Sequence, residues 1–101
     1  MGRFVSGALQ LRLELQVKLG RPIAQREIAS AVTERLEKRI PYFNRKVDRR
    51  VISRIENNES KEYDVEIMNE LGSYYSDYGL DVSKLLRFEP NNKAVLISAA
   101  A

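Results

Sequence analysis

Between Pro22 and Pro41, apolar residues recur at every fourth position, namely at Ile28, Val32, Leu36 and Ile40. This spacing places the side chains above one another on a single face of an α-helix. Proline limits the segment at both ends, because its ring cannot continue a helix beyond the first turn. We therefore expect a helix that begins near Gln25, ends at Pro41 and turns this face toward a core.

Residues 8–19 contain two apolar stripes. The strict alternation of apolar and polar residues is typical of a strand, but the residue types favour a helix that Gly20 ends. On a helix, one stripe consists of Leu9, Leu13 and Val17, and the other consists of Leu11, Leu15 and Leu19. If one stripe faces the core, the second apolar stripe has to be buried in another contact, for example in a dimer.

The rest of the chain predicts three more helices. Asp48 is a good N-cap for a short helix over 48–56. The later elements are a helix from Tyr63 to Tyr78, a short helix capped by Asp81 or Ser83, and the apolar run Ala94–Ile97 as a short strand. A chain of 101 residues supports one modest core. The expected fold class is all-α, with five helices in a single domain 1–101 and a tail at 89–101.

The composition excludes several kinds of site. The chain has no Cys and no His, so disulfides and thiolate or imidazole metal sites are excluded and no cofactor is expected. It contains no pair of nucleophile and base and no glycine-rich phosphate loop, so we do not expect an enzyme. No apolar run approaches the ~18 residues of a membrane span, and Arg12 and Glu14 interrupt any leader-like segment.

The net charge of +3 is unevenly distributed. Residues 1–55 carry thirteen basic and five acidic side chains, whereas residues 56–101 carry four basic and nine acidic ones. A basic half beside an acidic half indicates a polyanionic partner on one side of the molecule, or simply two solvated faces.

Three stretches of the sequence share a pattern with a known family, namely Gln25–Ala29 (QREIA), Val47–Asn58 (VDRRVISRIENN) and Leu80–Leu86 (LDVSKLL). They resemble, in order, the opening of the second helix, the recognition helix with its turn, and the last helix of lambda-repressor/Cro (Xre-like) helix-turn-helix domains. The resemblance covers residues 9–88. It implies a repressor-like, sequence-specific regulator that binds double-stranded DNA at the nucleoid, in a cytoplasm of bacterial, phage or plasmid context.

The resemblance also implies roles for particular side chains. An α-helix fits the major groove of B-DNA, where Arg is the commonest reader of guanine. The base-reading positions would be Arg49, Arg50 and Arg54, with Ser53 beside them. The phosphate-binding positions would be Gln25, Arg26, Asn57 and Asn58. Glu56 would be structural and pair with a basic residue of the first helix, for which we expect Lys18.

One departure from the family is large. The family has three or four residues between its second and third helices, whereas this chain carries an insertion at 34–46. Its apolar residues continue the stripe of the second helix, so we expect that helix to be longer. Its cations, Arg35, Lys38, Arg39, Arg45 and Lys46, either contact the DNA backbone or only solvate a longer helix and loop. Tyr42 and Phe43 either stack on bases or, as we prefer, anchor the loop to the core.

Two further partners follow from the sequence. The family binds palindromic sites as dimers, and the candidate interfaces here are the second stripe of 8–19, the tyrosine-rich end of the fourth helix, and the run Ala94–Ile97. Tyr74, Tyr75 and Tyr78 recur at helical spacing and are expected to belong to both the core and an interface. The alternative function is a protein-interaction module of the same fold, such as an antitoxin or a phage or plasmid accessory factor, with a partner on the acidic C-terminal half. Glu62, Glu66 and Glu70 are expected to form a solvated acidic face. The excess of six positive charges over 35–54 favours DNA.

Overall fold

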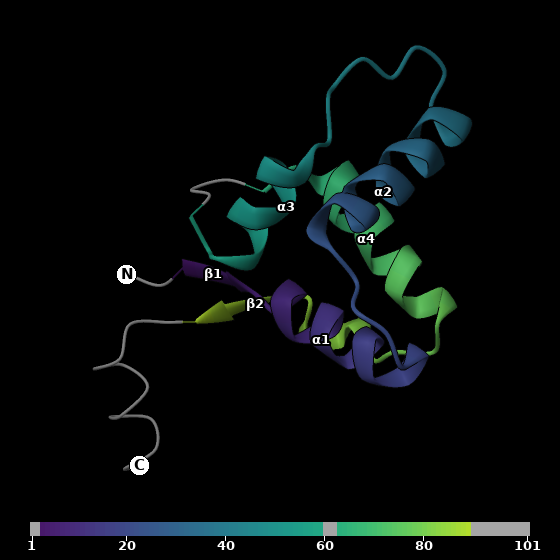
Figure 1. The fold of residues 1–101 in the computed structure, drawn as a ribbon. Coiled ribbons are helices and arrows are strands. Elements are labelled where there is room, and N and C mark those ends of the chain that lie inside the picture. Colours follow the sequence, from purple (N-terminus) through teal and green to yellow (C-terminus); the bar gives the residue numbers. More distant parts are fainter. Residues whose placement is uncertain (1–2, 60–62, 90–101) are drawn as a thin grey trace.

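The computed structural model describes residues 3–59 and 63–89, which form a mostly helical molecule (Figure 1). The elements run in the order β1 (Arg3–Ser6), α1 (Ala8–Leu19), α2 (Gln25–Arg39), α3 (Arg49–Glu56), α4 (Val65–Asp77), the 3-10 helix η1 (Val82–Lys84) and β2 (Leu86–Glu89). The expected fifth helix is thus one 3-10 turn. The expected strand at 94–97 lies outside the described residues.

The first two helices begin and end where the sequence predicts. Gly20 adopts a left-handed conformation with φ of 68° and donates its N–H to the Gln16 carbonyl, which closes α1. The second helix runs from Gln25 to Arg39 and absorbs the first six residues of the insertion. It ends at Ile40 in extended backbone, because a residue before proline is disfavoured in helical conformation.

Aspartate caps begin the later helices. The Asp48 carboxylate accepts a hydrogen bond from the Val51 N–H at 3.1 Å, and this bond lowers the pKa of Asp48. Asp64 accepts from the N–H groups of Glu66 and Ile67, so α4 begins two residues later than its apolar pattern indicates.

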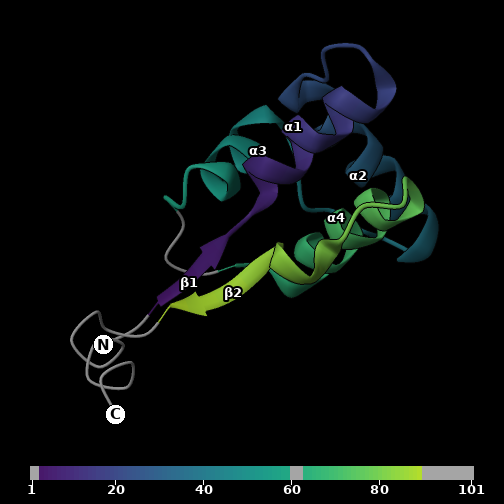
Figure 2. The ribbon, with the colours of Figure 1, turned by 90° about the horizontal axis from the view of Figure 1, so that it is seen from below.

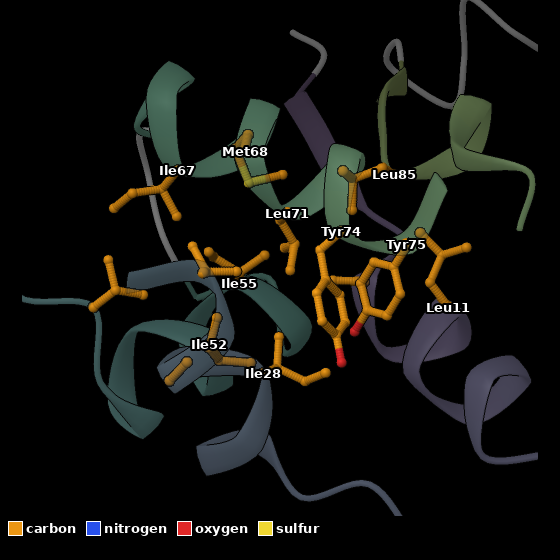
Figure 3. Packing of buried hydrophobic residues seen from close by; sticks show 14 of the residues in the cluster. Leu11, Ile28, Ile52, Ile55, Ile67, Met68, Leu71, Tyr74, Tyr75 and Leu85 are labelled. Carbon is orange, nitrogen blue, oxygen red and sulfur yellow. The ribbon is translucent and has the colours of Figure 1, made fainter. Parts of the chain in front are cut away.

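Four helices contribute to one core. Leu11, Ile28, Ile52, Leu71 and Tyr75 are almost completely buried and come from α1, α2, α3 and α4 (Figure 3). In α1 this burial selects one of the two stripes, the one with Leu11 and Leu15, although Leu19 at its end stays exposed. The other stripe remains on the surface, with Leu9, Leu13 and Val17 exposed by 38%, 47% and 83%.

The tyrosines of α4 belong to the core. Tyr75 is fully buried and Tyr74 is 6% exposed, and their rings meet edge to face with centroids 5.3 Å apart. Burial raises the pKa of Tyr74 to about 12. The expected core role is therefore confirmed for Tyr74 and Tyr75, whereas the expectation that these two residues also form an interface was wrong.

A two-stranded antiparallel sheet joins the two ends of the described chain (Figure 2). Its register pairs Phe4 with Phe88 and Ser6 with Leu86. Gly7 follows β1 where the chain passes η1, and a Cβ at Gly7 would lie 2.4 Å from the Lys84 carbonyl oxygen. Only glycine allows this approach. Neither strand is predicted from the sequence.

Candidate nucleic-acid interface

The outward side of α3 carries three arginines. Arg49 and Arg50 occupy the first turn and Arg54 the last, and all three are exposed. The inward side buries Ile52 and Ile55 in the core. This division follows from the helical period, since the apolar residues of this eight-residue helix lie on one face and the arginines lie on the other.

The positions of Arg49 and Arg50 are electrostatically unfavourable for the helix itself. The N-terminus of a helix carries a partial positive charge, and a cation there costs about 0.3–1 kcal/mol. No acidic residue lies in the first turn of α3, so only the cap Asp48 offsets the two charges. An anionic ligand at this end would relieve the repulsion.

A carboxylate behind α3 ties that helix to the first two. Glu56 is 4% exposed. Its oxygens accept hydrogen bonds from Arg12 Nε at 2.7 Å, from Arg12 Nη2 at 3.0 Å and from Gln25 Nε2 at 2.8 Å. The bond to Glu56 raises the pKa of Arg12. These contacts support the structural role that is expected for Glu56.

The partner predicted for Glu56 was wrong. The basic residue comes from the expected helix, but it is Arg12 and not Lys18. Arg12 follows the buried Leu11 and contacts Glu56 of α3, whereas Lys18 is exposed in the last turn of α1 beside Gly79. The sequence predicts that the partner lies in the first helix, but only the packing of α1 decides which basic residue of that helix meets Glu56.

Gln25 connects this network to the surface. Its amide nitrogen donates to Glu56, and its amide oxygen faces Arg49 Nη1 at 3.5 Å. The side chain is therefore held at the start of α2, next to the first turn of α3. Gln25 has one amide N–H left over for the predicted phosphate contact.

An open groove separates α2 from the N-terminal end of α3. Its lining includes Arg26 and Ser30 of α2 and Arg49 and Arg50 of α3. Within residues 3–59 and 63–89, Arg26, Arg50 and Arg54 form no ion pair. Arg26, Arg49 and Arg50 thus border the groove, and the cap Asp48 is the one carboxylate among the residues that line it.

The turn after α3 uses its polar groups within the protein. The N–H groups of Asn57, Asn58 and Glu59 donate to carbonyls of α3. The Asn58 side-chain oxygen accepts from the Ser6 N–H at 2.6 Å and from the Tyr63 hydroxyl at 3.1 Å. Asn58 has φ of 57°, in the left-handed region that asparagine tolerates. The Asn58 side chain thus fastens β1 to this turn, and the phosphate contact predicted for Asn58 stays a prediction.

Asn57 and Ser53 contact each other on the exposed side of this turn. The Asn57 amide donates to Ser53 Oγ at 3.2 Å. Ser53 keeps its own hydroxyl hydrogen for a ligand.

Three cations of the insertion, Arg35, Arg39 and Arg45, pair with carboxylates of α4 or of its cap. Arg35 Nε and Arg39 Nε donate to the two oxygens of Glu70, each at 2.9 Å, and Arg35 also pairs with Asp77 at 2.8 Å. Arg45 pairs with Asp64, and Lys38 pairs with Glu34 one turn earlier in α2. Arg39 and Arg45, which were predicted to bind phosphate, are therefore held by carboxylates.

The acidic side of α4 receives these cations. Glu70 is only 6% exposed, so the expectation of a solvated acidic face was wrong for this residue. Burial opposes its ionisation, but the hydrogen bonds from Arg35 and Arg39 outweigh burial and lower the pKa of Glu70. Some of the basic residues in the first half of the chain thus form ion pairs with acidic residues in the second half. Glu62 lies outside the described residues.

Among the predicted phosphate-binding cations of the insertion, Lys46 remains exposed and makes no ion pair in the described part of the chain. It lies two residues before the cap Asp48 and so extends the basic edge formed by Arg49 and Arg50.

Comparison with known proteins gives no match: no protein-family model fits the sequence, and no curated protein and no solved structure is significantly similar to the chain. No helix in the described ranges is long and apolar enough to cross a membrane.

Proposed function

We propose that the protein is a sequence-specific regulator that binds double-stranded DNA and reads the major groove with α3, in the manner of lambda-repressor/Cro domains. The observation that carries this proposal is the arginine pair in the first turn of α3. Arg49 and Arg50 weaken the helix electrostatically, are exposed, and have no acidic neighbour in that turn. A nucleic-acid ligand supplies the missing negative charge.

The chemistry of the groove fits this ligand. Side chains at the N-terminal end of a recognition helix reach base edges, and Arg donates two parallel hydrogen bonds to guanine. The network of Glu56, Gln25 and Arg49 restricts one of these readers before DNA arrives. Arg26 borders the same groove and would meet the phosphate backbone.

A protein-interaction module is less well supported. That function would use the acidic C-terminal half, but Glu70, Asp77 and Asp64 already pair with arginines of the same chain.

We also propose that the protein binds DNA as a homodimer through the exposed stripe of α1. Leu9, Leu13 and Val17 lie on one face of this helix, and contiguous exposed apolar side chains mark interaction surfaces. A second copy would bury the same stripe from the other side of a two-fold axis, which suits a palindromic site.

The test is selection from a randomised duplex pool, followed by affinity measurements on the selected duplex. We expect Arg50→Ala to lose about 1–3 kcal/mol of binding free energy at one base pair and to relax specificity there. Lys18→Ala is the matched control, because it removes one positive charge from the far end of α1. Failure of wild-type protein to enrich any duplex would contradict the proposal and favour the protein-interaction module.

A further inference from the structure

The loop between α2 and α3 holds an aromatic side chain away from the protein. Tyr42 is 99% exposed and has φ of 62°, a backbone conformation that is rare and costly for a bulky residue. Its neighbour Phe43 is partly buried against the core. The anchoring role expected for both aromatics therefore belongs to Phe43 alone.

The base of this loop is fastened on both sides. The Phe43 N–H donates to the Ile40 carbonyl, and the Arg45 guanidinium lies 5.2 Å from the centroid of the Phe43 ring. Arg45 also pairs with Asp64 at the start of α4. On the other side, the Thr33 hydroxyl donates to the Val47 carbonyl at 2.9 Å. Backbone strain at Tyr42 is thus maintained by contacts of its neighbours.

The loop leads directly into the arginine-bearing end of α3. It rises beyond α2 and descends into the first turn of α3 (Figure 1). Lys46 stands on this descending segment, exposed and without an ion pair among the residues described. Arg39 and Arg45 near the tip are paired with carboxylates, whereas Tyr42 and Lys46 are both exposed.

We propose that Tyr42 and Lys46 form a second contact with duplex DNA, on the sugar–phosphate backbone that flanks the bases read by α3. The Tyr42 hydroxyl donates to a phosphate oxygen, and Lys46 neutralises a neighbouring phosphate. This inference rests on the proposed function. It adds that the DNA site is longer than the bases read by α3, because the insertion supplies an extra contact.

The experiment compares two duplexes, the full selected site and a version shortened to the bases that α3 specifies. On the full site, we expect Tyr42→Phe and Tyr42→Ala each to weaken binding about tenfold, since a hydrogen bond to a charged group is lost. We expect Lys46→Gln to reduce the slope of log affinity against log salt by about one. On the shortened duplex all three variants should bind like wild type. Lys18→Gln, a lysine outside the loop, is the charge control and should behave like wild type on both duplexes.

The outcomes separate this inference from the function on which it rests. If Arg50→Ala is impaired while Tyr42→Ala and Lys46→Gln bind the full site as tightly as wild type, the loop contact is overturned and the DNA-binding function stands. If the variants lose equal affinity on both duplexes, a contact with flanking DNA is likewise overturned. If wild-type protein enriches no duplex, both proposals fall. Tyr42 and Lys46 are exposed, so unchanged melting temperatures are expected and would show that the variants are folded.

Discussion

At the scale of single residues, Glu56 shows how a buried charge positions a surface. Its carboxylate joins Arg12 of α1 and Gln25 of α2 to α3, and Gln25 in turn faces Arg49. A buried ion pair adds little net stability compared with apolar residues of similar size, but the loss of one partner leaves the other charge uncompensated. Glu56 therefore restrains the expected base-reading helix, and the loss of either partner of its ion pair would destabilise the fold.

Replacement of this carboxylate should be costly. We expect Glu56→Gln to lower the free energy of unfolding by about 3 kcal/mol, because Arg12 stays buried without its counter-ion. Urea denaturation followed by circular dichroism measures the change. Glu37→Gln, on the exposed surface of α2, is the control and should shift stability by less than about 0.5 kcal/mol. Equal effects of the two substitutions would contradict the role of Glu56.

At the scale of elements, the insertion is built as an extension of α2 that is clamped to α4. Arg35 and Arg39 lie one turn apart on α2 and meet the same carboxylate, Glu70. Arg45 adds a second attachment at the cap of α4. The loop that follows is therefore presented from a supported base, which the proposed contact of Tyr42 with DNA requires.

The clamp should have a characteristic dependence on pH. The folded protein lowers the pKa of Glu70, so its contribution is present above the ordinary glutamate pKa and is lost as the pH falls through the lowered value. We expect Glu70→Gln to cost about 1–2 kcal/mol near pH 7. This difference from wild type should shrink steadily below about pH 4.

Denaturation curves across the acidic range measure this effect. Glu34→Gln, which removes a solvent-exposed pair with Lys38, is the control and should cost about 0.3–0.5 kcal/mol at most. A Glu70→Gln difference that is independent of pH would show that packing, and not the charge, makes the contribution.

At the scale of the whole molecule, residues 3–59 and 63–89 leave an apolar face of α1 exposed. The sheet of β1 and β2 closes the described chain on itself, and the core takes Leu11 and Leu15 from α1. The opposite face of α1 is still apolar and exposed, and a second copy of the chain would cover it.

A polar residue in that face should weaken self-association. We expect Leu13→Ser to raise the dimer dissociation constant about tenfold or more, because an isologous interface loses two buried leucines. Sedimentation equilibrium measures this constant. Val65→Ser replaces an exposed apolar residue on α4 and should leave the dimer unchanged. Wild-type protein that stays monomeric at high concentration would exclude this interface.

Local patterns in the sequence determined the helices of this protein. The signals are the stripe Ile28, Val32, Leu36 and Ile40, the cap Asp48, and the breakers Gly20 and Pro41. They act over one or two helical turns, so they can be recognised without knowing the rest of the molecule. The outward side of α3 follows from the same periodicity. The lengthened second helix was predictable for the same reason.

The tertiary structure alone decided which distant groups meet. Arg12 and not Lys18 reaches Glu56, Arg35 and Arg39 converge on Glu70, and Asn58 fastens β1. These partners are separated by 31 to 52 residues, and each pairing depends on how two helices dock or how a turn meets a strand. The strands escaped prediction because each has four residues and is defined only by the other. Ion pairs and hydrogen bonds depend on short distances in space, and the spacing of residues in the sequence does not determine those distances.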